Sequence, residues 1–174
     1  MTEDLRYPIG YCVTPAEISV EARTKAIAAI AALPGQLREA VEDLSEEQLN
    51  TPYREGGWSV VQVVHHVADS HANASIRVRL ALTEDWPTIK AYDEKAWAEL
   101  GDAKAPVGWS LNIIENVHAR WVMLLQSLDE AQWKRGFVHP ERGSSSIEVA
   151  TLLYEWHSKH HLAHIVGLRE RMGW

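Results

Sequence analysis

The sequence predicts an all-α protein built as a four-helix bundle. Four long stretches have apolar residues at helical spacing, one long connection separates the second from the third, and no segment shows the extended alternation of a long strand. Long helices joined by short links and one crossover are typical of bundles. The chain has 174 residues, 46% of them hydrophobic, and is expected to form one domain over residues 1–174.

The first helix is expected over residues 19–44. Ser19 is a suitable N-cap, and strong helix formers follow it. Pro34-Gly35 should kink or break this helix, because proline lacks a backbone donor. Residues 45–49 have the pattern of a short capped turn of helix.

The second helix is expected over residues 60–82, after a Gly56-Gly57 loop. Residues 86–108 then form a long crossover, with a short helix over 94–100.

The third helix should span residues 110–128, where apolar residues and His118 recur at helical spacing. Residues 136–146 are rich in turn formers and predict a small hairpin. The fourth helix follows over residues 147–172.

The last helix carries four of the nine histidines: His157, His160, His161 and His164. A helix turns about 100° per residue, so His157, His161 and His164 share the face expected to point into the core. Apolar packing alone does not explain why three imidazoles would be buried, whereas binding of a metal ion would explain it. His157 and His161, four residues apart, present two nitrogens to one point. His160 and His164 form a second such pair, with His160 at the edge of the stripe.

A third ligand must come from another helix, and His65 or His66 is the obvious donor. His65 shares its face with apolar residues, whereas His66 shares its face with polar residues, which a metal pocket needs to orient its imidazoles. This favours His66. His71 is expected to be solvated. His118 is expected to have a structural role in the core, with lining of the pocket as the alternative. A pH-sensitive interface and accidental histidine enrichment are the alternatives to a metal site.

Five polar residues share the helix face of His66: Gln62, Asp69, Ser70, Asn73 and Arg77. Asp69 could act as a general base, orient an imidazole or remain a solvated carboxylate. Asn73 and Arg77 are candidates for substrate binding. Arg77 could grip a substrate carboxylate or be a surface charge.

Composition excludes several classes of function. A net charge of -7 argues against nucleic-acid binding, and no apolar stretch is long enough to span a membrane. The single cysteine, Cys12, cannot form an internal disulfide, and residues 1–4 are acidic rather than the start of a signal peptide. We therefore expect a cytoplasmic protein. The HExxH motif of zinc proteases and a glycine-rich phosphate loop are absent from the sequence.

Several segments resemble the DinB superfamily, specifically its YfiT branch. They are residues 51–71, with the run from Trp58 to His66, then 92–97, 134–137 and 156–174 with its His157/His161 pair. The start at residues 7–10 is also similar, so that the resemblance covers nearly the whole chain.

The resemblance implies a four-helix bundle with one divalent metal, zinc or nickel. Its first ligand stands eight residues after Trp58, at His66, and the other two are His157 and His161. His164 would then line the pocket and touch substrate. The resemblance also implies a cytoplasmic homodimer that acts on a small molecule, either as a metal-dependent hydrolase or by transferring a low-molecular-weight thiol such as bacillithiol.

Three neutral imidazoles would leave the metal an open position. A water bound there has its pKa lowered towards ~7 and can attack an ester or amide. The same position could instead hold a thiol as thiolate. A fourth ligand such as His164 would close the site and favour a non-catalytic metal-binding bundle. A plain helical interaction module is the remaining alternative.

Overall fold

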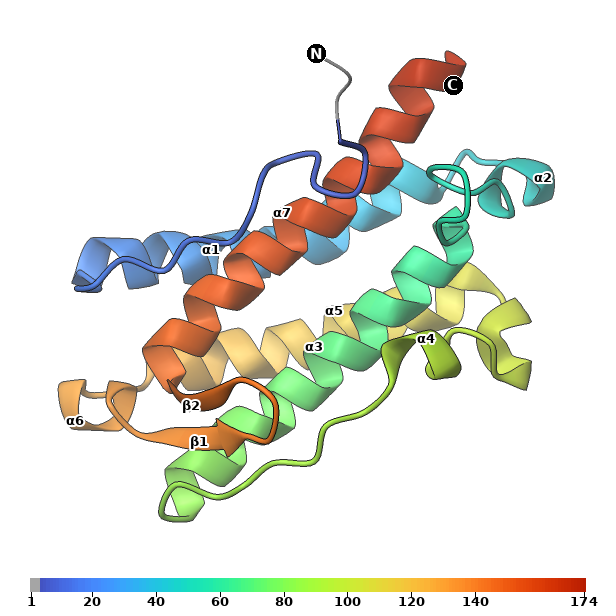
Figure 1. The fold of residues 1–174 in the computed structure, drawn as a ribbon. Coiled ribbons are helices and arrows are strands. Elements are labelled where there is room, and N and C mark those ends of the chain that lie inside the picture. The colour runs from blue at the N-terminus through green and yellow to red at the C-terminus, as the bar shows by residue number, and fades with distance from the viewer. Residues whose placement is uncertain (1–3) are drawn as a thin grey trace.

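The computed structural model describes residues 4–174. Residues 1–3, which belong to the acidic start used in the prediction about signal peptides, lie outside the described part. Four long helices form a bundle, as predicted: α1 (Val20–Val41), α3 (Val60–Thr83), α5 (Val107–Gln126) and α7 (Ile147–Met172) (Figure 1). Helices α1 and α3 each pack against both α5 and α7. Each of the four therefore buries two faces rather than one.

Short elements fill the connections. Between α1 and α3 lies α2 (Glu46–Leu49), and the crossover contains α4 (Glu94–Trp97) and η1 (Gly101–Lys104). Helix α6 (Glu130–Trp133) follows α5, and a hairpin precedes α7. The crossover runs along α3 and reaches the hairpin, where the backbone N–H of Ile89 donates to the carbonyl of Val138 (Figure 1).

The predicted hairpin consists of β1 (Gly136–His139) and β2 (Gly143–Ser146), paired antiparallel with Phe137 opposite Ser145. Phe137 is buried in the bundle, which holds the hairpin against the start of α7.

Serine caps set where the helices begin. Ser19, Ser59 and Ser146 each accept a hydrogen bond from a backbone N–H in the first turn of α1, α3 and α7. At Ser59 the cap is reciprocal, because the side chain of Gln62 accepts from the Ser59 backbone N–H. Helix α7 begins and ends at the predicted residues, 147 and 172.

Helix α1 does not break at Pro34. It continues as one α-helix from Val20 to Val41 with the proline inside it. The prediction that Pro34-Gly35 could break the helix was therefore wrong. An interior proline costs a helix about 3 kcal/mol. Leu33 and Leu37, on either side of it, are almost completely buried, and their packing offsets that cost.

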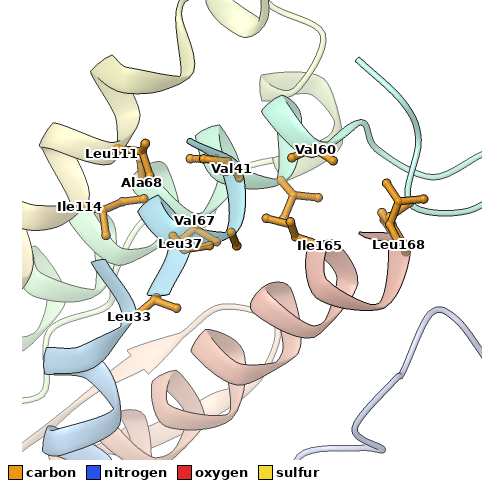
Figure 2. Packing of buried hydrophobic residues seen from close by; sticks show 14 residues of the cluster. Leu33, Leu37, Val41, Val60, Val67, Ala68, Leu111, Ile114, Ile165 and Leu168 are labelled. Carbon is orange, nitrogen blue, oxygen red and sulfur yellow. The ribbon is translucent and has the colours of Figure 1, made fainter. Parts of the chain in front are cut away.

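The apolar core is divided into two clusters. One lies towards the C-terminal end of α7 and joins all four long helices through residues such as Leu37, Val67, Ile114 and Ile165 (Figure 2). The other lies towards the hairpin. Its buried residues include Ile30, Val78, Trp121 and Tyr154.

Histidines occupy the level between the two clusters. On α5, His118 follows Ile114 of the first cluster and precedes Trp121 of the second. His71 has the corresponding place on α3. On α7 the same level is reached between Tyr154 and Ile165, where His157 and His161 stand. Within residues 4–174, no helix is long and apolar enough to cross a membrane.

Candidate metal centre

Three histidines predicted to meet are brought together by α3 and α7. One ring nitrogen from each of His66, His157 and His161 lies within 4.8 Å of the others. The Nε2 atoms of His66 and His157 are 3.2 Å apart. Two nitrogens on one tetrahedral zinc, each about 2.0–2.1 Å from it, would stand about 3.3 Å apart. The observed separation therefore fits two imidazoles that share an ion.

Local structure explains why these rings converge. His157 and His161 are one helical turn apart on α7, with ring centroids 4.4 Å apart. The capping box at Ser59 fixes the start of α3, two turns before His66. The indole of Trp58 packs against the His66 ring at 4.7 Å between centroids and limits its rotation.

Burial keeps the three imidazoles neutral. Desolvation lowers the pKa of His66 to about 4 and lowers the pKa values of His157 and His161 well below the usual 6.5. A neutral imidazole has one nitrogen with a free lone pair, which is the form that binds a metal. The Nδ1 atom of His161 is buried and has no hydrogen-bond partner among residues 4–174. Three neutral nitrogen donors at this separation fit a divalent ion that favours imidazole, such as zinc or nickel.

Two cavities, each of about 280 Å³, meet at His66. The first is lined on its acidic side by Asp69 and Asp102. The second contains Arg77, and His157 and His161 line it. Tyr92 and Glu94, from the crossover, line both cavities. Small molecules in either cavity would therefore reach the same histidine.

The polar residues predicted around His66 fall in different places. Asp69 lines the first cavity, and burial raises the pKa of its carboxyl group. Arg77 lines the second cavity, where its guanidinium lies 5.9 Å from the ring centre of Tyr92. Asn73 donates to the backbone carbonyl of Asp69, and the linings of these two cavities do not include it. His65 lines the first cavity, and its ring contacts Ser110 Oγ at 2.7 Å.

His71 is not solvated as predicted but fully buried. Its Nε2 lies 3.0 Å from Nδ1 of His157, and its Nδ1 lies 2.8 Å from Nε2 of His118. The prediction assumed one buried stripe on this helix. Helix α3 instead buries one face against α5 and another against α7, and His71 lies between them.

A second histidine group lies on α7 beside the first. His160, His161 and His164 each offer a ring nitrogen within 4.8 Å of the other two. His160 stacks on Trp156, and His164 stacks on Tyr53 with centroids 4.0 Å apart. The Nε2 of His164 lies 3.3 Å from the carbonyl of Arg6, so this nitrogen is the one that carries the proton. His164 does not contribute to the two cavities beside His66.

Some residues of the site were not singled out from the sequence. Tyr92 and Glu94 lie in a largely irregular connection, where no periodicity indicates direction. Burial raises the pKa of Tyr92 to about 12, so its hydroxyl keeps its proton. Tyr154 and His139 line the second cavity. The segment 92–97 was among those that carried the family resemblance, and this was the one available signal.

Comparison with known proteins supports a common architecture. A protein from Bacillus mycoides named "Putative metal-dependent hydrolase" is 52% identical over 172 residues, which is 99% of each chain. Proteins of the same name from Bacillus cereus strains are also 52% identical over 98% of this chain.

Solved structures agree. YfiT from Bacillus subtilis, described as a probable metal-dependent hydrolase with an unusual four-helix bundle topology, superposes with a TM-score of 0.95 at 50% identity over 98% of both chains. A second four-helix bundle protein shares the fold alone, with a TM-score of 0.57 at 19% identity. Residues 29–165 match the DinB superfamily. The chain therefore belongs to the DinB superfamily and has the four-helix bundle of YfiT.

Proposed function

We propose that this protein is a hydrolase that uses one divalent metal ion, zinc or nickel, held by His66, His157 and His161. The observation that carries the proposal is the convergence of three neutral imidazole nitrogens at the point where two cavities meet. The names of its Bacillus relatives support the same reaction class.

Such an ion, when bound, supplies a Lewis acid and lowers the pKa of coordinated water towards ~7. The rest of the chemistry falls to the residues of the cavities. Among the carboxylates that line the cavities, our candidates to accept a proton are Asp69, one helical turn from His66, and Glu94, which belongs to both cavities. Arg77 is placed to bind a negatively charged group of a small-molecule substrate in the second cavity.

Thiol transfer is the second candidate. The two cavities that meet at His66 favour it, because a transferase must hold a thiol and an electrophile at once. The same three histidines would serve both reactions, because a divalent ion held by them could activate either water or a thiol. A homodimer in the cytoplasm is the setting that we propose for either reaction.

A turnover screen separates the candidates. The metal-loaded protein would be incubated with model esters and amides, and in parallel with an electrophile and small thiols. We expect hydrolysis without thiol. Product only in the presence of thiol would overturn the hydrolase proposal in favour of transfer.

Controls address the remaining alternatives. His66→Ala should be inactive in both arms, and Asp69→Asn and Glu94→Gln test which carboxylate takes the proton. One bound ion per chain without turnover would indicate a non-catalytic metal-binding bundle. Far less than one ion per chain would indicate a helical interaction module.

A further inference from the structure

Two buried histidines connect the candidate centre to the opposite side of the bundle. His71 on α3 and His118 on α5 are 0% and 1% exposed, and neither lines the cavities beside His66. From the centre outwards, His157 Nδ1 lies 3.0 Å from His71 Nε2, and His71 Nδ1 lies 2.8 Å from His118 Nε2. His118 Nδ1 lies 2.6 Å from the carbonyl oxygen of Ile30 on α1. We name this chain of contacts the histidine relay.

The end of the relay sets the direction of every hydrogen bond in it. A carbonyl oxygen can only accept, so His118 must donate to Ile30 from Nδ1. The Nε2 of a neutral His118 is then an acceptor and receives the proton of His71 Nδ1. By the same reasoning, His71 Nε2 accepts from His157 Nδ1. His157 is left with an unprotonated Nε2, and that is the atom 3.2 Å from His66 Nε2.

Burial makes this sequence of donors self-consistent. The three rings lie in the interior, where a charged imidazole is disfavoured, and burial lowers the pKa values of His71 and His157 well below 6.5 and that of His118 to about 4. Each ring therefore carries one proton, and one proton per ring is the number that the relay needs.

A proline supplies the acceptor at the end of the relay. In an α-helix the carbonyl of residue 30 would accept from the backbone N–H of residue 34. Residue 34 is proline and has no N–H, so the carbonyl of Ile30 lacks its usual donor inside α1. His118 Nδ1 takes that place. The proline that interrupts the hydrogen bonds of α1 thus provides an anchor point for a side chain of α5.

We propose that His71 and His118 are positioning residues, which hold His157 in the tautomer whose Nε2 faces the metal and which are themselves fixed by the carbonyl that Pro34 leaves free. This inference rests on the proposed metal centre but not on the reaction that the centre catalyses. Partners that orient a metal-binding histidine through its second nitrogen typically change metal affinity by about 10- to 100-fold.

Metal affinity tests the proposal, with zinc alone as the probe in competition with a chromophoric chelator. His71→Phe keeps a ring of similar size but removes the acceptor of His157, and we expect affinity to fall about 10- to 100-fold with binding of one ion per chain retained. His118→Phe acts one step further away and should cost about three- to tenfold.

His65→Phe is the matched control. His65 stands on the same helix and has two hydrogen-bonding contacts, to Ser110 Oγ and the carbonyl of Ala105, but it is not part of the relay. The zinc affinity of the His65→Phe variant should stay within about twofold of that of the unmodified protein. If His65→Phe weakened binding as much as His71→Phe, the relay would have no special role.

A spectroscopic measurement on the unmodified protein tests the proposal even if the variants do not fold. In the metal-free protein labelled with ¹⁵N-histidine, long-range ¹H–¹⁵N correlations should show His157 protonated at Nδ1 and not at Nε2. In His71→Phe this preference should be lost. A proton on Nε2 of His157 in the unmodified protein would overturn the proposal.

The two possible failures differ in their signature. If His66→Ala retained full zinc affinity, the metal centre itself would be wrong. If His66→Ala lost zinc while His71→Phe bound it as tightly as the unmodified protein, the centre would stand and the relay would be refuted.

Discussion

Two groups of three histidines share helix α7, and they differ in how their rings are held. The first combines His157 and His161 with His66 from α3, and the second combines His160 and His164 with the same His161. In the first group, His157 is held through its second nitrogen by a hydrogen-bonded partner. The Nδ1 of His161, which belongs to both groups, and those of His160 and His164 in the second group are buried and have no hydrogen-bond partner within residues 4–174.

The surroundings of the two groups differ as well. The first group opens onto cavities that a small molecule could enter. In the second group, the rings of His160 and His164 stack on Trp156 and Tyr53, and the N-terminal segment lies against them through Arg6 and Tyr7. Proximity of imidazoles is therefore the same in both groups, whereas orientation and access distinguish them. We expect only the first group to bind metal.

The largest effect should follow removal of the ligand that α3 contributes to the first group. His66→Ala leaves two imidazoles from one helix and should reduce zinc affinity by more than about 100-fold, measured by chelator competition and by metal analysis after gel filtration. Retained full occupancy would show that the second group, or another set of residues, holds the ion.

Acid should destabilise the metal-free protein, and here the two groups should behave alike. Burial lowers the pKa values of both His66, in the first group, and His160, in the second, to about 4, so the neutral rings favour the folded state. Their contribution is complete above the unfolded value of 6.5 and is lost as the pH falls towards 4. Each such ring should reduce the free energy of unfolding by about 1.4 kcal/mol per pH unit in that window.

Urea denaturation of the metal-free protein at pH 7.5, 6 and 5 would measure this loss. His66→Phe and His160→Phe should flatten the pH dependence by similar amounts. A large difference between them would mean that the two groups differ in protonation as well as in orientation.

Replacement within the second group should have little effect on metal. His160→Phe and His164→Phe keep the stacking on Trp156 and Tyr53, and we expect zinc affinity within about threefold and an unchanged ion count of one per chain. Equilibrium dialysis would test this. Two ions in the unmodified protein and one in these variants would break the distinction between the groups.

Replacement of Pro34 should have a small effect on zinc affinity and a larger one on stability. Pro34→Ala restores a backbone N–H that competes with His118 for the carbonyl of Ile30. Helix α1 should become more stable, by up to about 3 kcal/mol, while zinc affinity falls about two- to threefold. Thermal unfolding and chelator competition would be measured on the same samples. A gain in stability with unchanged affinity would remove Ile30 from the relay.

The sequence predicted the fold well because the helices carry strong local signals. The N-cap at Ser19, the Gly56-Gly57 loop and the turn-rich residues 136–146 indicated where α1, α3 and α7 begin. Helical spacing predicted that His157 and His161 pair, the polar neighbours of His66 favoured it over His65, and the family resemblance implied the same three residues.

Features that depend on tertiary contact were not predictable in this way. His71 was misplaced because its face becomes interior only when α5 packs beside α3. Tyr92 and Glu94 come from an irregular connection, in which residue spacing says nothing about direction. Pro34 was read as an interruption of a helix, and its relation to His118, 84 residues later in the chain, required coordinates.

The hydrogen bond from His118 to the carbonyl of Ile30 couples α1 to a metal centre to which this helix contributes no ligand. Because binding energies between linked sites are reciprocal, ion uptake that tightens the relay must also make α1 harder to open. Amide hydrogen exchange around Ile30 should therefore slow when zinc is added and quicken when a chelator removes it. Because Pro34 has no backbone N–H, the stability of α1 would depend on whether the metal ion is bound.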